Sequence, residues 1–125
     1  MDLSVLHGSY NQLPPPKNLP PPTNILEAWQ QGTPYWQGRK LTENRVAMAA
    51  IAKYGRFVNV LQLESYFMKE NLRPLTFGYT LQGLKQSNRL LTFFDKTKYT
   101  KRIYGLHSWV DETGEIRPEH AYELS

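Results

Sequence analysis

Residues 90 to 106, LLTFFDKTKYTKRIYGL, are the stretch that decides the fold. Its two ends, 90–95 and 102–106, have the β-branched and aromatic content of strands. The segment between them is short enough to be a hairpin loop, and cations crowd around one aromatic there. These residues are Lys96, Lys98, Tyr99, Lys101 and Arg102. The stretch therefore predicts a β-hairpin with a basic tip, called the wing below.

Upstream of the wing, the first helical pattern begins at Thr42, which suits the N-cap position, and runs to about Tyr54. Its apolar positions 46, 47, 50, 51 and 54 form one stripe, as expected for a helix with one buried face. Gly55 follows where a left-handed C′ residue is common.

The second helical pattern has clearer start signals. Asn59 suits the N-cap, and Gln62 stands three residues later in a capping-box arrangement. Val58 can staple to Leu63 across this helix start. Pro74 marks the break after the helix.

The third helical pattern runs from about Thr76 to Asn88. Phe77, Leu81 and Leu84 are spaced i, i+4, i+7, which predicts that they form the buried side. The opposite side carries polar residues and one aromatic. These are Tyr79, Gln82, Gln86 and Arg89, with Lys85 beside them.

The order helix, helix, helix, strand, strand is the layout of a winged helix, an α+β fold, over residues 42–110. The phrase Tyr104-Gly105-Leu106-His107-Ser108-Trp109 at its end is similar to winged-helix modules of the HARE kind, known from RNA polymerase delta subunits, and to modules attached to restriction enzymes. This resemblance to the winged helix-turn-helix superfamily implies that Leu106 and Trp109 are core residues. The phrase by itself indicates a fold and not a function.

Residues 1–41 lie outside the resemblance and read as a proline-rich arm with one short helix. The phrase LPPPKNLPPP, residues 13–22, favours a polyproline II linker or a packed arm, with a peptide ligand for a protein partner as the alternative. Asn24 can cap a helix over 25–31. Trp29, Tyr35 and Trp36 then cover the domain's own core or form a dimer contact, so monomer and homodimer both stay open.

Charge is distributed unevenly around a net value of +4. Residues 39–102 hold 13 Lys and Arg against 4 Asp and Glu, a local balance of +9, whereas residues 103–125 hold one Arg against five acids. A basic middle suits a polyanion-binding body, although a solvated Lys-rich surface has the same composition. We expect the acidic tail, residues 111–125, to be partly ordered, and we consider that it competes with nucleic acid by folding onto the basic face.

Several classes of protein are disfavoured. The chain has no cysteine, which excludes disulfides and thiol nucleophiles. The spacing of metal ligands is missing from the three histidines, His7, His107 and His120. The spacing of a calcium-binding loop is missing from the acids Asp111, Glu112 and Glu115. The sequence also contains no phosphate-binding loop and no hydrolase motif. We therefore expect no enzyme, metal or cofactor. With no signal-peptide pattern and no apolar run of about 18 residues, we expect a cytoplasmic protein without a membrane partner.

Double-stranded DNA is the partner that the resemblance and the charge favour. The third helix would read bases in the major groove through Gln82, Lys85, Gln86 and Arg89, with Tyr79 near its start as a phosphate contact or as packing. The wing would neutralise phosphates. A role in transcription regulation is one expectation. The alternative is a winged-helix module that binds another protein without DNA contact; a polar helix face and a charged hairpin also occur without any ligand.

Overall fold

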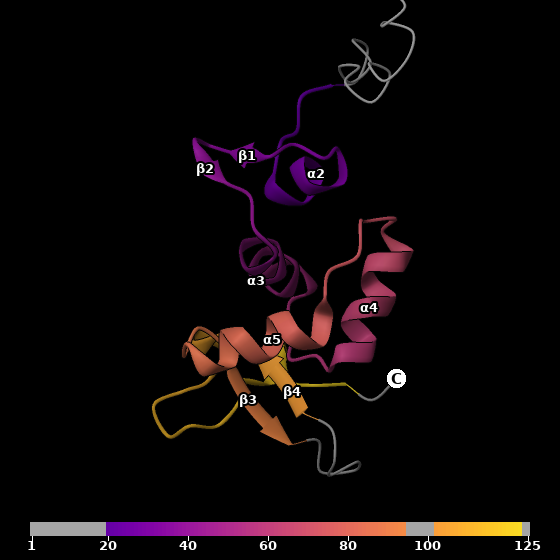
Figure 1. Cartoon of the computed structure of the whole chain (residues 1–125). Helices are drawn as coiled ribbons and strands as arrows, with labels where there is room; N and C mark the ends of the chain where they lie inside the picture. The colour runs from indigo at the N-terminus through magenta and orange to yellow at the C-terminus, as the bar shows by residue number, and fades with distance from the viewer. Residues whose placement is uncertain (1–19, 95–101, 124–125) are drawn as a thin grey trace, which may run out of the picture.

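The computed structural model describes residues 20–94 and 102–123, and it is an α+β fold (Figure 1). In Figure 1, α2 and the β1–β2 hairpin lie at the top, the β3–β4 hairpin lies at the bottom, and α3, α4 and α5 lie between them. The described elements are, in order, α2 (Ile25–Gln30), β1 (Tyr35–Trp36), β2 (Arg39–Lys40), α3 (Glu43–Tyr54), α4 (Val60–Lys69), α5 (Phe77–Gln86), β3 (Leu91–Phe94), β4 (Arg102–Gly105) and the 3-10 turns η2 (His107–Trp109) and η3 (Pro118–His120).

Both ends of α3 are where the sequence predicts them. The Thr42 hydroxyl accepts a hydrogen bond from the backbone N–H of Arg45, and Gly55 ends the helix with φ of 89°. That left-handed conformation is strained for residues with a Cβ. Val46, Ala47, Ala50 and Ile51 are completely buried, which confirms most of the predicted apolar stripe.

The capping box of α4 is confirmed. The side chain of Asn59 accepts from the backbone N–H of Gln62 at 2.7 Å, and the backbone N–H of Asn59 donates to Gln62 Oε1 at 3.0 Å. Val58 and Leu63, the predicted staple, are both completely buried. The caps fix where α4 begins and therefore how the preceding loop enters it.

Helix α5 buries the side that its spacing predicts, since Leu81 and Leu84 have no exposed surface and Phe77 is 9% exposed. The prediction that it continues to Asn88 is wrong, because the helix ends at Gln86. Asn88 adopts a left-handed φ of 62°, and the Arg89 N–H bonds back to the Leu84 carbonyl at 2.8 Å. These bonds satisfy the last carbonyls of the helix, so Arg89 lies beyond it.

Strands β3 and β4 are antiparallel, with Leu91 opposite Gly105 and Phe94 opposite Arg102. The other edge of β4 pairs with Val58 at Tyr104, which ties the hairpin to the α3–α4 connection. The rest of the predicted wing, residues 95–101, lies outside the described residues.

The Tyr104–Trp109 phrase packs around the completely buried ring of Phe57. A Cβ at Gly105 would lie 2.6 Å from three carbons of that ring, so the glycine is required for this close approach. Trp109 is 5% exposed, with its ring centroid 5.9 Å from that of Phe57, and Leu106 is half-buried against the core. His107 Nε2 lies 2.8 Å from the Asn88 carbonyl and fastens the turn after α5.

Helix α2 packs on α3, and Leu26 and Trp29 belong to the same core cluster as the later helices. Its N-cap is Asn24, as the sequence predicts. The Trp29 indole N–H donates to the Arg73 carbonyl at 2.8 Å, and the Arg73 guanidinium lies 3.9 Å from the centroid of the Trp29 ring. These contacts bind α2 to the α4–α5 connection.

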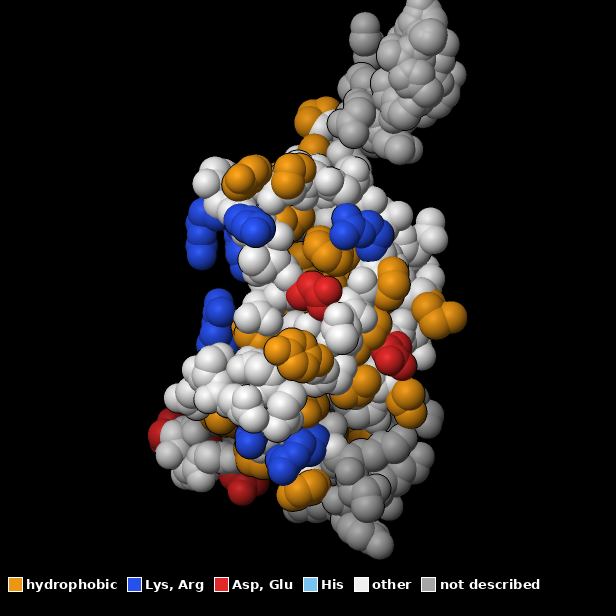
Figure 2. Space-filling model, viewed as in Figure 1, with side chains coloured by type: hydrophobic (Ala, Val, Ile, Leu, Met, Phe, Trp, Pro, Cys, Tyr) orange, Lys and Arg blue, Asp and Glu red, His pale blue; other side chains and the backbone are white. Residues whose placement is uncertain are grey.

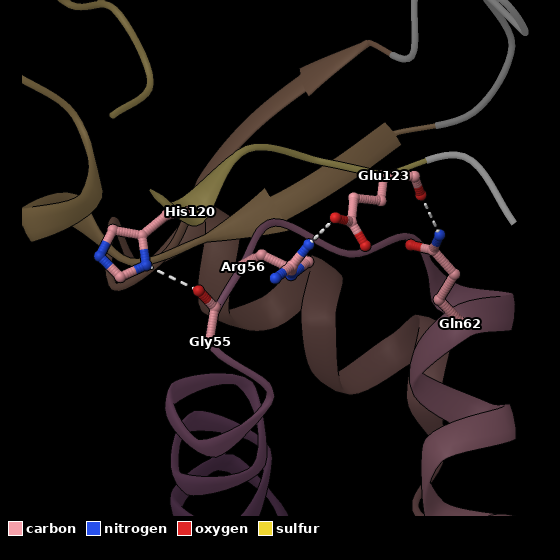
Figure 3. A network of polar contacts seen from close by, with 5 residues as sticks. All are labelled: Gly55, Arg56, Gln62, His120 and Glu123. Carbon is pink, nitrogen blue, oxygen red and sulfur yellow. Dashed lines mark hydrogen bonds and ion pairs between the residues drawn. The ribbon is translucent and has the colours of Figure 1, made fainter. Parts of the chain in front are cut away.

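The described part of the acidic tail packs against the loop between α3 and α4 (Figure 3). His120 stacks on Trp109 with 4.5 Å between ring centroids, and its Nδ1 lies 2.6 Å from the Gly55 carbonyl. Glu123 pairs with Arg56, while its carbonyl accepts from the Gln62 side chain at 2.6 Å. We call residues 118–123 the strap.

Candidate nucleic-acid interface

The outer face of α5 is exposed. Tyr79 is 81% exposed, Gln82 and Gln86 are exposed, and Lys85 is half-buried. In the described part of the chain, none of these side chains makes a hydrogen bond or an ion pair. Because a polar group loses little by staying hydrated at a surface, this face is available to an outside partner without breaking internal contacts.

A surface groove runs between this face and the N-terminal end of α3. The predicted residues that it gathers are Tyr79, Gln82, Gln86 and Arg89, the last of these from the turn after the helix. Lys85 does not line the groove. From α3 and its N-cap, the wall is made of Thr42, Glu43 and Asn44.

Glu43 holds α5 in place, and sequence reasoning missed it. Its Oε1 accepts from the Thr76 N–H at 2.8 Å and from the Thr80 hydroxyl at 2.9 Å. Its Oε2 lies 3.4 Å from the Thr76 hydroxyl. Thr76 is the residue before α5, so the carboxylate also lies at the positive end of that helix. The contact joins residues 33 to 37 apart, and no local pattern indicates it.

Of the predicted wing residues, Arg102 is the one that the structure describes. Its guanidinium carbon lies 4.5 Å from the centroid of the Phe94 ring, and Phe94 is 53% exposed. This cation–π contact orients the arginine along the outside of the hairpin. Lys96, Lys98, Tyr99 and Lys101 lie outside the described residues, so their place relative to α5 stays a prediction.

The face shown in Figure 2 carries charges of both signs: Asp and Glu side chains lie in its centre, toward its right side and at its lower left, among the Lys and Arg side chains. Lys and Arg side chains lie above and below an indentation at the left edge, and others lie near the bottom.

Burial raises the pKa of the Tyr104 hydroxyl, with the Arg102 charge acting in the opposite direction, so Tyr104 is neutral at physiological pH. The hairpin base therefore carries the charge of Arg102 unopposed by a phenolate.

In the described part of the chain, no strap residue lines the groove. The strap bonds instead to the loop between α3 and α4 and to the start of α4, through hydrogen bonds with Gly55, Asn59 and Gln62 and the ion pair of Glu123 with Arg56. The tail's own turn is held by Asp111, whose Oδ1 accepts from Thr113 N, Thr113 Oγ1 and Glu115 N. Those hydrogen bonds, the one from the Thr113 hydroxyl foremost, lower the pKa of Asp111.

Within the described ranges, no three His, Asp or Glu side chains gather into a metal site, and no helix is long and apolar enough to cross a membrane. Comparison with known proteins adds no identity: no family model, no curated protein and no solved structure matches this chain. The winged-helix resemblance therefore stays a prediction from the Tyr104–Trp109 phrase and the order of the elements.

Proposed function

We propose that the chain is a winged helix that binds double-stranded DNA, with α5 in the major groove and the wing on the adjacent backbone. The observation that carries this proposal is the outer face of α5. It presents Gln82 and Gln86, with Arg89 just beyond, in one groove and free of partners in the described part of the chain.

The chemistry of this face fits base edges. A Gln side chain pairs with the N6 and N7 atoms of adenine, and an Arg guanidinium pairs with O6 and N7 of guanine. Each good bidentate pair contributes about 1–3 kcal/mol of discrimination between bases. The hydrogen bonds that Thr76 and Thr80 donate to Glu43 fasten the start of α5, the helix that carries Gln82 and Gln86, to α3.

Phosphate contacts are assigned to the wing and to Tyr79. Lys96, Lys98 and Lys101 would each neutralise a phosphate, while Arg102 lies at the base of the same hairpin. Such contacts position the protein and increase affinity without reading sequence. DNA binding would thus divide between a reading helix and a positioning hairpin.

A protein-binding module is the second candidate, and α4 supplies the observation that favours it. Leu61 is 54% exposed and Met68 is 80% exposed, seven residues apart and therefore on one side of the helix. Exposed apolar side chains gathered on one face are typical of protein contacts. This face lies on α4 and not on the outer face of α5, so variants can separate the two functions.

The test is a titration of the full chain against mixed-sequence duplex DNA over a range of salt concentrations. The variant changes Lys96, Lys98 and Lys101 to Ala. A matched control removes the same charge from exposed positions outside the groove; it changes Lys53, Lys69 and Arg117 to Ala. If three phosphate contacts are lost, the slope of log K against log salt becomes shallower by about 2.7 in the variant, and it changes little in the control.

Two results would count against the proposal. Absence of binding by the wild-type chain at low salt would refute DNA binding outright. Equal slopes for the variant and the control would remove the wing from the interface. If the wild type binds, selection of a preferred site followed by Gln82→Ala and Gln86→Ala tests base reading, with a loss of about 1–3 kcal/mol of discrimination expected for each.

A further inference from the structure

The hairpin of β1 and β2 is a second basic hairpin, at the opposite end of the molecule from the wing. Tyr35 pairs with Lys40 and Trp36 with Arg39. The two residues between the strands, Gln37 and Gly38, have φ of 52° and 76°. Two consecutive positive φ values are those of a type I′ turn, whose twist matches that of paired strands.

This hairpin is fastened to the main body by contacts that do not use its basic side chains. The Arg45 guanidinium, from the first turn of α3, donates to the Arg39 carbonyl at 3.1 Å and to the Lys40 carbonyl at 2.9 Å. The Leu41 N–H donates to the Pro34 carbonyl at 2.8 Å, and the Leu41 side chain is 7% exposed. The hairpin therefore has a defined position even though it is short.

The side chains of Arg39 and Lys40 are exposed. In the described ranges, neither has a carboxylate within ion-pair distance. Arg45 adds a third positive charge at the base, and Tyr35, 58% exposed, stands opposite Lys40. Three cations and one exposed aromatic thus lie on a rigid support without internal neutralisation.

The hairpin leads through Leu41 into one wall of the α5 groove. Lys40 is separated only by Leu41 from Thr42, and Thr42 to Asn44 form the α3 wall of that groove. In Figure 1, α3 and α5 both lie between the two hairpins, with α3 next to the β1–β2 hairpin and α5 next to the β3–β4 hairpin. Figure 2 shows Lys and Arg side chains above and below the indented edge on the β1–β2 side.

We propose that Arg39, Lys40 and Arg45 bind the DNA backbone on the side of α5 opposite to the wing. The inference rests on the proposed function. A helix seated in the major groove, about 12 Å wide, has one sugar–phosphate strand along each side. The wing meets one strand, and the β1–β2 hairpin meets the other. Glu43 also lines the groove, but its oxygens accept hydrogen bonds from Thr76 and Thr80.

The experiment compares the double variant Arg39→Ala/Lys40→Ala with the double variant Lys53→Ala/Lys69→Ala, which has the same net charge. Arg45 stays unchanged because its bonds to the backbone hold the hairpin. Each protein is titrated against one mixed-sequence duplex across a fourfold range of salt. Circular dichroism confirms that each variant is folded.

Loss of two phosphate contacts makes the salt slope shallower by about 1.8, so a fourfold rise in salt weakens the wild type about 12-fold more than the Arg39/Lys40 variant. The Lys53/Lys69 control keeps the wild-type slope. If the wild type binds and the two double variants have equal salt slopes, the β1–β2 hairpin does not contact the DNA backbone, although the proposal of DNA binding is unaffected. If the wild type binds no duplex at low salt, both the backbone contact by this hairpin and the proposed function are refuted.

Discussion

Replacing Gly105 with alanine perturbs the packing at the end of β4, where the β3–β4 hairpin meets the core. The new Cβ would lie 2.6 Å from three ring carbons of Phe57, about 0.8 Å inside the shortest ordinary contact of 3.4 Å. The ring has little room to move, because Phe93 and Trp109 flank it with centroids 5.7 and 5.9 Å away. Overpacking of this kind costs about 1–3 kcal/mol. Alanine loses less conformational freedom than glycine when it is fixed in a strand, which offsets about 0.5–1 kcal/mol of this cost.

We therefore expect Gly105→Ala to lower the free energy of unfolding by up to about 2.5 kcal/mol. Urea unfolding followed by tryptophan fluorescence measures it by linear extrapolation, provided that the slope with urea is unchanged. Gly83→Ala is the matched control. Gly83 has nothing within 4 Å of its would-be Cβ, and it stands inside α5. The same substitution there should stabilise by up to about 1 kcal/mol.

A double-mutant cycle identifies the partner of the new methyl group. Phe57→Leu replaces the flat ring with a smaller, more adaptable side chain, so its cost and that of Gly105→Ala should not add. We expect the double variant to be more stable than the sum of the single changes predicts, by at least about 0.5 kcal/mol. Strict additivity, or a Gly105→Ala variant as stable as Gly83→Ala, would refute the close approach of ring and strand.

Two further predictions concern polar contacts. Glu43→Ala leaves the buried Thr80 hydroxyl without its acceptor, which should lower the free energy of unfolding by about 1–3 kcal/mol. Glu43→Gln keeps an acceptor oxygen and should lower it less. Equal losses of unfolding free energy for the two variants in urea would contradict this. Asp111 has a lowered pKa in the folded state, so its carboxylate stabilises the fold above the unfolded-state pKa, and that contribution is lost as pH falls through the folded-state pKa. The stability difference between wild type and Asp111→Ala should therefore shrink from about pH 7 to about pH 3, and a constant difference would contradict the assignment.

Local signals in the sequence predicted the helix starts well. The side chains of Thr42 and Asn59 accept hydrogen bonds from N–H groups three residues ahead, so four consecutive residues are enough to predict each cap. The end of α5 was predicted two residues too late, although Asn88 carries a signal for it: after Gly, Asn is the residue that most often adopts the left-handed conformation that ends a helix. The polar face of α5 followed from spacing alone, but the position of Arg89 beyond the helix did not.

Tertiary contacts explain most of what the sequence did not reveal. The hydrogen bond that the Thr80 hydroxyl donates to Glu43 joins residues 37 apart, and neither residue type is unusual at its position. The β1–β2 hairpin did carry a signal, since Gln37-Gly38 separates an aromatic pair from a basic pair, but strands of two residues are too short for periodicity to show. The acidic composition of the tail indicated no specific contact, whereas the structure holds the tail through His120, Tyr122 and Glu123.

The contacts of the strap form later during synthesis than the helices that they join. His120 and Glu123 reach back 61 to 65 residues to Gly55 and Gln62. A nascent chain folds from its N-terminus as it emerges, so α3, α4, α5 and the wing leave the ribosome while the Gly55 carbonyl and the Arg56 side chain still lack these partners. The corner between α3 and α4 therefore forms early, and its contacts with the strap follow only after another 61 to 65 residues have emerged.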